Sequence, residues 1–226
     1  MLNEHIASQI YANFAFAPTL GQKKIIEALA SWLSDADTER IFILNGYAGT
    51  GKTSIIAAFV ATLKKLRIKP VMLAPTGRAA KVMARHTGLG ASTIHKKIYR
   101  QKSSADPEPG FSLDFNREKD ACFIVDEASM LSASADAGSP FGSGSLLDDL
   151  FQYVRQGTRC RILFVGDDAQ LPPVGHDRSP ALDPDFMAAY GAVEYGTLDE
   201  VMRQSDDSGI LFNATMVRCM LEAGIT

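Results

Sequence analysis

One short stretch constrains the fold of this chain more than any other. Residues 46–53 read GYAGTGKT and match the pattern G-x-x-x-x-G-K-[ST], which binds phosphate when it lies between a strand and a helix. Both neighbours meet that requirement, because Ile41 to Leu44 is a short apolar run and Ser54 to Leu66 has apolar residues at helical spacing. The sequence therefore predicts a strand, a glycine loop and a helix in that order.

The residue types in this loop suit a bound triphosphate. Glycines let backbone N–H groups surround phosphate oxygens, and the N-terminus of the following helix adds positive potential. Lys52 is placed to reach the β and γ phosphates, and the Thr53 hydroxyl to bind Mg²⁺. We therefore predict a nucleotide site formed by Gly46, Ala48, Gly49, Thr50, Gly51, Lys52 and Thr53.

The rest of the chain continues to alternate between apolar runs and helically spaced segments. Strands are predicted at residues 70–74, 121–125 and 161–165, and helices at residues 20–33, 77–86 and 146–155. Such alternation is typical of an α/β fold in which a parallel sheet is covered by helices on both faces.

Two stretches interrupt the alternation. Residues 96–119 contain two extended segments, KKIYRQK and GFSLDFN, around the turn-rich SSADPEP, and they predict a small inserted β-hairpin. Residues 132–145, SASADAGSPFGSGS, are rich in small residues and predict a flexible surface loop.

Polar residues follow two of the predicted strands. Asp126 comes directly after the apolar run 121–125 and is suited to hold Mg²⁺, while the adjacent Glu127 is suited to polarise an attacking water as a general base. An Asp-Glu pair alone is more often a solvated turn, but here it accompanies a phosphate loop. Gln170, after the strand at 161–165, is placed to sense a γ phosphate, and the alternative is a turn closed by prolines.

The charge of the chain is distributed unevenly. The 23 Lys and Arg residues and 26 Asp and Glu residues give a net charge of −3, which by itself argues against nucleic-acid binding. Residues 40–105, however, carry 13 basic residues and no acidic residue. This segment predicts an anionic partner such as nucleic acid, although solvated helix faces would produce the same pattern.

Composition also indicates the compartment. Cys122, Cys160 and Cys219 are odd in number and lack metal-ligand spacing, so we expect reduced, structural cysteines. No apolar run approaches the roughly 20 residues that span a bilayer. We therefore expect a cytoplasmic protein without a membrane partner.

The motifs together resemble those of the superfamily 1 helicases, most closely the RecD and Dda branch, group B. Residues 19–22 are similar to the Q motif of these helicases and GYAGTGKT to motif I. Five further stretches resemble the later motifs of these helicases: APTGRAAKVM (74–83, Ia), STIH (92–95, Ib), VDEASM (125–130, II), LFVGDDAQLPP (163–173, III) and LDEVMRQ (198–204, IV).

The resemblance implies roles for further residues. Gln22 would read the adenine edge, and Arg203 would contact the γ phosphate as an arginine finger in cis. Either residue could instead be an ordinary polar residue of the surface. The single strand of DNA would be held by Thr76, Arg78, Thr93 and His95.

The resemblance also implies a domain plan. Residues 1–95 and 120–226 would form the first of two RecA-like motor domains, and we expect the second, with motifs V and VI, to be absent from this chain. The hairpin at residues 96–119 would act as a pin that separates strands by stacking Tyr99, Phe111 and Phe115 on the last base pair, or it would merely cover the domain.

The implied function is that of an ATP-dependent DNA helicase. ATP and Mg²⁺ would be its cofactors, single-stranded DNA and duplex junctions its partners, and 5′ to 3′ its direction. Subunits of a helicase-nuclease complex are possible further partners, and DNA repair or recombination the setting. The chain alone is expected to be poorly active. The alternatives are a nucleotide-gated nucleic-acid-binding module and an ATPase that remodels RNA or DNA without unwinding it.

Overall fold

A parallel sheet forms the centre of the computed structural model, which describes residues 1–102, 110–134, 139–170, 172–173, 175–176 and 178–200. Its strand order is β3-β2-β6-β7-β1-β8, and every neighbouring pair runs parallel. The strands are β1 (Ile41–Gly46), β2 (Lys69–Ala74), β3 (Ala91–Thr93), β6 (Ala121–Val125), β7 (Arg161–Gly166) and β8 (Val193–Leu198). The predicted parallel sheet is confirmed.

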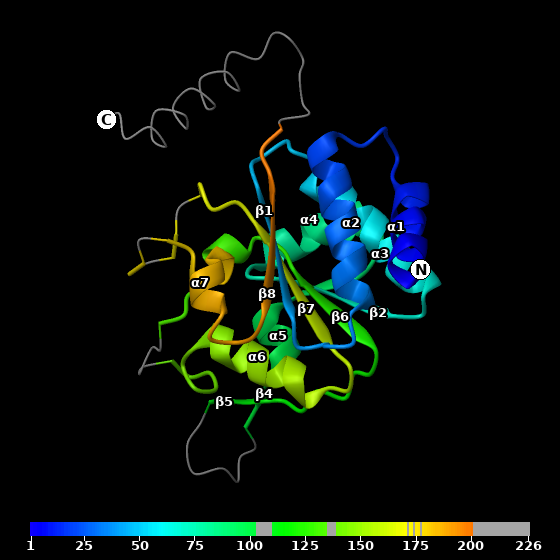
Figure 1. Cartoon of the computed structure of the whole chain (residues 1–226). Helices are drawn as coiled ribbons and strands as arrows, with labels where there is room; N and C mark the ends of the chain where they lie inside the picture. The colour runs from blue at the N-terminus through cyan, green and yellow to red at the C-terminus, as the bar shows by residue number, and fades with distance from the viewer. Residues whose placement is uncertain (103–109, 135–138, 171, 174, 177, 201–226) are drawn as a thin grey trace, which may run out of the picture.

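Helices cover both faces of the sheet (Figure 1). One face packs against α1 (Leu2–Asn13), α2 (Leu20–Ser34), α3 (Lys52–Lys65) and α4 (Gly77–Thr87), and the other against α5 (Ile94–Ile98), α6 (Leu146–Gln156) and α7 (Pro184–Met187). Successive side chains of a strand point to opposite faces, so Phe42 and Leu44 enter the first core and Ile41 and Ile43 the second. This explains why the strands are apolar throughout.

The predicted hairpin is present but shorter than expected. β4 (Tyr99–Gln101) pairs antiparallel with β5 (Phe111–Leu113). Residues 96–98, predicted to be extended, are instead the last turn of α5, because the Thr93 hydroxyl accepts a hydrogen bond from the Lys96 N–H and caps a helix there. The predicted turn, residues 103–109, lies outside the described residues.

The segment after motif II lies along the hairpin. The Phe111 N–H donates to the Pro140 carbonyl at 2.8 Å, and the Gly142 N–H donates to the Phe111 carbonyl at 3.0 Å. The Phe141 and Phe111 rings stack with centroids 4.6 Å apart. Residues 139–145, predicted to be part of a flexible surface loop, thus contact the hairpin, although Pro140, Gly142 and Ser143 are exposed. Residues 135–138 of that loop lie outside the described residues.

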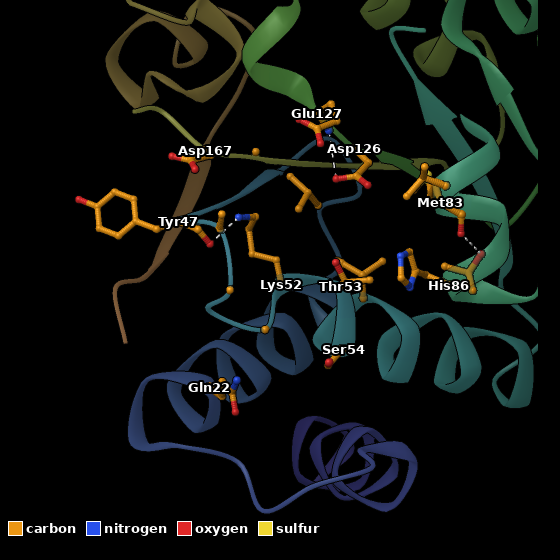
Figure 2. Close-up of a pocket in the computed structure, with 18 of the residues that line it drawn as sticks. Gln22, Tyr47, Lys52, Thr53, Ser54, Met83, His86, Asp126, Glu127 and Asp167 are labelled. Atoms are coloured by element: carbon orange, nitrogen blue, oxygen red, sulfur yellow. Dashed lines mark hydrogen bonds between the residues drawn. The ribbon is translucent and has the colours of Figure 1, made fainter. Parts of the chain in front are cut away.

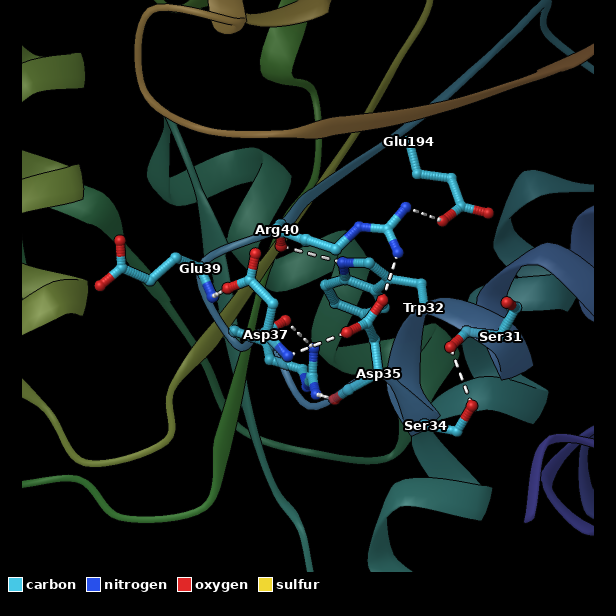
Figure 3. A network of polar contacts seen from close by, with 9 residues as sticks. Ser31, Trp32, Ser34, Asp35, Asp37, Glu39, Arg40 and Glu194 are labelled. Atoms are coloured by element: carbon cyan, nitrogen blue, oxygen red, sulfur yellow. Dashed lines mark hydrogen bonds and ion pairs between the residues drawn. The ribbon is translucent and has the colours of Figure 1, made fainter.

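A polar network joins α2 to the sheet (Figure 3). The Trp32 indole N–H donates to the Arg40 carbonyl at 2.9 Å, and the Arg40 guanidinium pairs with Asp35 and with Glu194 of β8. The guanidinium of Arg161 on β7 donates to backbone carbonyls of the connection from α2 to β1 and lies over the Trp32 ring. These contacts fix the start of β1, and thereby the strand that carries the phosphate loop.

Candidate functional site

The phosphate loop leads from the end of β1 into the first turn of α3. Gly49 and Gly51 have φ values of 86° and 91°, in the left-handed region that favours glycine. A Cβ on Gly51 would also lie 2.4 Å from the Gln22 amide nitrogen. Gly51 is the N-cap of α3, so the unpaired N–H groups of a helix start lie at the loop, which is an arrangement that attracts anions.

The Lys52 ammonium lies across the loop. Its Nζ donates to the backbone carbonyls of Gly46 and Tyr47, the second at 2.9 Å. Figure 2 shows the side chain rising from α3 toward Tyr47, with Thr53 beside it. The two carbonyl oxygens accept the hydrogen bonds that phosphate oxygens would accept from this ammonium. A triphosphate that binds Lys52 would therefore replace them.

Two adjacent carboxylates follow β6. The Asp126 side chain accepts a hydrogen bond from the Glu127 N–H at 3.0 Å, and Glu127 has a left-handed φ of 54° that is uncommon outside glycine. Burial raises the pKa of both carboxyls, and the negative charge of Asp126 raises the pKa of Glu127 further, while Lys52 opposes both shifts. A raised pKa makes Glu127 a stronger base toward water than an exposed carboxylate.

A third carboxylate, Asp167, follows β7. Because β7 pairs in parallel with both β6 and β1, its carboxyl end lies between Asp126 and the phosphate loop. Asp167 is 2% exposed and lines the same cavity as Gln170. The sequence analysis assigned Asp167 no role, although its place at a strand end beside motif II was the signal that could have found it.

The residues predicted to hold Mg²⁺ line one cavity. Thr53 and Asp126 both face it (Figure 2). Across the described residues, no group of three or more His, Cys, Asp or Glu side chains is arranged to hold a metal. Mg²⁺ is commonly bound through one or two protein oxygens, substrate phosphates and water. A hydroxyl and a carboxylate beside a phosphate loop therefore fit Mg²⁺ that arrives with a triphosphate.

The cavity has a volume of 660 Å³, within the range of about 300 to 1,000 Å³ that is usual for small-molecule sites. Part of its lining is apolar, with Phe14 and Phe16 between α1 and α2, and Val82 and Met83 on α4. No motif covers Phe14 and Phe16, and motif Ia, which ends with Val82 and Met83, was expected to meet DNA and not the nucleotide.

Gln22 lies behind the loop. It is 2% exposed, its Oε1 accepts from the Thr19 N–H at 3.1 Å, and its Nε2 donates to the Thr50 carbonyl at 3.1 Å. Both ends of the amide are thus engaged within the chain, which ties the start of α2 to the phosphate loop. The side chain also lines the cavity, where a nucleobase would have to compete for these bonds.

The predicted DNA contacts lie near two adjacent strand ends. Thr76 caps α4 and Thr93 caps α5, and the β2–β3 register pairs Ala74 with Thr93. The two helix N-termini therefore lie at the same edge of the sheet as the phosphate loop. Arg78 is exposed in the first turn of α4. Arg203, the predicted arginine finger, lies outside the described residues.

His95 is packed among aromatic rings. Its ring centroid lies 5.0 Å from that of Phe141 and 5.7 Å from that of Tyr99. Burial lowers the pKa of His95, so its neutral form is favoured. A contact of His95 with DNA stays a prediction, and the neutral ring would make it through hydrogen bonds.

The structure corrects the assignment of pin residues. Tyr99 is 8% exposed, and its hydroxyl donates to Asp149 of α6 at 2.6 Å. Phe111 is stacked on Phe141, whereas Phe115 is 62% exposed. Tyr99 is therefore unavailable to stack on a base pair, because its ring and hydroxyl are used to hold the hairpin to the domain. Phe115 alone of the three predicted residues is fully accessible.

The basic segment is only partly neutralised by the fold. Lys69 and Lys97 both pair with Glu118, at 2.7 and 2.8 Å. The exposed basic residues of α4 form no ion pair within the described part of the chain; they are Arg78, Lys81 and Arg85. Spacings of three and four residues place them on one side of the helix. No helix in the described ranges is long and apolar enough to cross a bilayer.

Comparison with known families identifies the chain. A family model described as an AAA domain matches residues 19–215. The chain belongs to this family. It is 31% identical over 163 residues to the ATP-dependent RecD2 DNA helicase of Deinococcus radiodurans, and 28% identical over 205 residues to the RecBCD subunit RecD of Mycolicibacterium smegmatis. With the motif series, these matches show an AAA domain similar to those of RecD-type helicases.

Solved structures share the fold. Pif1 helicase from Candida albicans matches with a TM-score of 0.55, and Pif1 from Bacteroides in complex with ADP-AlF3 and ssDNA with 0.50, each at 19% identity. The matches cover 90% and 87% of this chain, and 44% and 45% of those chains. Against the curated relatives, the RecD2 match covers 70% of this chain and 19% of the relative, and the RecD match 78% and 33%. This AAA domain therefore spans a minor part of the proteins it resembles.

Proposed function

We propose that this AAA domain is the ATP-hydrolysing motor of a DNA helicase, coupling hydrolysis to movement along single-stranded DNA and to unwinding. The observation that supports this most strongly is the convergence of Lys52, Asp126 and Glu127 on one cavity. A phosphate-binding cation, a metal-binding carboxylate and a base are the parts that hydrolysis of a triphosphate requires. A relative named as an ATP-dependent DNA helicase supports the choice of DNA as the polymer.

In the proposed reaction, the β and γ phosphates replace the carbonyls of Gly46 and Tyr47 at the Lys52 ammonium. Mg²⁺ held by Thr53 and Asp126 would neutralise the charge on the phosphates. Glu127 then accepts a proton from the attacking water. Removal of water from the half-buried site would strengthen each of these electrostatic interactions.

The nucleotide base would occupy the apolar end of the cavity, between the connection that carries Phe14 and Phe16 and helix α4. For Gln22 to read adenine, as the helicase resemblance implies, its amide has to release Thr19 or Thr50. Arg203, if it acts as an arginine finger, would complete the γ-phosphate site from residues outside the described part of the chain.

Single-stranded DNA would cross the edge of the sheet formed by the ends of β2 and β3. Thr76 and Thr93 lie there, and the exposed basic side of α4 begins at Arg78. We further propose a second RecA-like domain that closes the nucleotide site and grips the strand in alternation with this one. The 5′ to 3′ direction and a helicase-nuclease partner are proposals from the helicase resemblance, and a cytoplasmic location is a proposal from the cysteine usage.

One observation favours an ATPase that remodels nucleic acid without unwinding it. Tyr99 is buried and Phe111 stacks on Phe141, so two of the three residues proposed to split a base pair already have partners in the fold. The exposed Phe115 keeps the pin model open to test.

Strand separation by the full-length protein distinguishes these functions. Duplexes with a 5′ or a 3′ single-stranded tail would be mixed with protein and Mg·ATP, and release of a fluorescent strand followed. We expect unwinding of the 5′-tailed duplex by wild type and none by Lys52→Ala. Hydrolysis stimulated by DNA without release of either strand would favour the remodelling ATPase.

A further inference from the structure

A buried hydroxyl holds the side chain of Gln170 at the cavity. The Ser129 Oγ donates a hydrogen bond to the Gln170 Oε1 at 3.3 Å. Ser129 is fully buried in the short 3₁₀ helix η1 (Ala128–Met130), whose N-cap is Glu127, whereas Gln170 is exposed and lines the cavity. Ser129 does not line the cavity, so it reaches a bound nucleotide only through Gln170.

The orientation of this amide matters for a bound triphosphate. With Oε1 held by Ser129, the amide can present its Nε2 hydrogens to a γ-phosphate oxygen. In the flipped amide, Nε2 would donate to the Ser129 Oγ and the carbonyl oxygen would be directed at a negatively charged phosphate. Within the described residues the Gln170 side chain forms no other hydrogen bond, so Ser129 is what holds it.

Close packing brings the two segments into this contact. A Cβ on Gly166, at the end of β7, would lie 3.2 Å from the Ser129 backbone nitrogen and 2.7 Å from a Leu182 methyl carbon. A side chain at Gly166 would therefore crowd both Leu182 and the backbone of η1. On the β7 side, the Gln170 N–H donates to the Asp167 carbonyl at 3.1 Å, which fixes the turn that carries Gln170.

We propose that Ser129 is a positioning residue for hydrolysis. Its hydrogen bond holds Gln170 against the segment that carries the general base, Glu127. Because Glu127 caps the helix that contains Ser129, the group that activates water and the group that contacts the γ phosphate are held at a fixed separation. This inference rests on the proposed ATPase function and adds to it a residue that itself touches neither nucleotide nor metal.

A double-mutant cycle in the full-length protein tests the inference. Turnover and KM for Mg·ATP in the presence of single-stranded DNA would be measured for wild type, Ser129→Ala, Gln170→Ala and the double variant. Ser129→Ala is expected to lower kcat about tenfold, with KM changed less than about threefold. Because Ser129 acts through Gln170, the double variant should be no slower than Gln170→Ala.

Ser179→Ala is the matched control. Ser179 is also buried beside η1, but its hydroxyl donates to the Ala128 carbonyl at 3.5 Å and not to Gln170. The kcat of the Ser179→Ala variant should therefore stay close to that of wild type. Binding of a non-hydrolysable ATP analogue and the melting temperature would be measured for each variant. Both should be unchanged in Ser129→Ala.

Several outcomes would overturn the inference. Wild-type turnover in Ser129→Ala would show that the hydroxyl does not matter, and a double variant slower by the product of the two single effects would show that Ser129 does not act through Gln170. A loss of analogue binding or of melting temperature in Ser129→Ala would indicate a structural role. A wild-type protein that hydrolyses no nucleotide would instead overturn the proposed function itself.

Discussion

The Lys52 ammonium lies at the phosphate loop, where it donates to the Gly46 and Tyr47 carbonyls. Lys52→Ala removes it from the loop carbonyls and from any triphosphate, so it should weaken Mg·ATP binding and lower hydrolysis by at least about 100-fold. Lys65→Ala, an exposed lysine at the end of the same helix, is the control. Binding of a fluorescent nucleotide and phosphate release would be measured. Equal turnover in the two variants would refute the role of Lys52.

Glu127 should separate binding from chemistry. Glu127→Gln keeps the size of the side chain and removes the base, so Mg·ATP should bind with near wild-type affinity while single-turnover hydrolysis slows by about 100-fold or more. The same nucleotide-binding and phosphate-release measurements report both effects. If Glu127→Gln lost binding as severely as Lys52→Ala, the two residues would not have the separate roles proposed.

His95 should make stability sensitive to acid. Its folded pKa lies below the ordinary histidine value of 6.5, so the unfolded chain takes up a proton first as pH falls, and stability is lost from about 6.5 downward toward the folded pKa. His95→Phe keeps an aromatic ring but cannot titrate, so its melting temperature should fall less between about pH 7.5 and about pH 5.5. His5→Phe, at an exposed site, should behave as wild type. An identical acid dependence in wild type and His95→Phe would contradict this account.

The residues of the site differ in how far the sequence could predict them. The phosphate loop and the Asp126-Glu127 pair are local motifs, and all of them except Gly46 and Thr50 line one cavity. The place of Asp167 at the site could not be predicted without knowing which strand lies beside β6. The place of Phe14 could not be predicted without knowing how the N-terminal helix packs. Tyr99 was misassigned because an aromatic residue in a hairpin has the same sequence signature whether it faces solvent or the core.

At the scale of elements, the aromatic contacts of Phe141 hold the hairpin to the domain. Its ring contacts those of Phe111, Tyr99 and His95, with centroids 4.6 to 5.2 Å away. Phe141→Ala should lower the free energy of unfolding by about 1 to 3 kcal/mol, because a partly buried aromatic cluster is lost. Phe115→Ala, an exposed residue of the same region, should change it by less than about 0.5 kcal/mol. Urea denaturation would measure both, and equal effects would show that the packing of Phe141 is not what matters.

Helices and strands were predicted correctly where the segment with regularly spaced apolar residues was long enough to recognise. The helices over 20–33, 77–86 and 146–155 and the long buried strands appear within a few residues of their expected bounds. β3 was missed because its three residues, Ala-Ser-Thr, carry no apolar pattern and are held by pairing with β2. α5 was taken for strand because five residues are too few for helical spacing to be recognised.

At the scale of the whole molecule, the segregated charge should control DNA affinity. Arg78 lies at the carboxyl edge of the sheet, whereas Lys64 lies near the far end of α3, at the opposite edge. Arg78→Ala should lower the slope of log affinity against log salt for single-stranded DNA by about 1, and Lys64→Ala should leave it unchanged. Fluorescence anisotropy over a salt series measures both slopes. Equal reductions would indicate diffuse attraction without a defined path for the strand.

Hydrolysis of ATP in response to single-stranded DNA is the central property proposed for this AAA domain. The most direct test is steady-state phosphate release from Mg·ATP by the full-length protein, with and without an oligonucleotide, beside Glu127→Gln under the same conditions. We predict that the oligonucleotide raises wild-type turnover by about tenfold or more, and that Glu127→Gln remains near background in both conditions. Turnover that is unaffected by DNA, or that survives in Glu127→Gln, would contradict the claim.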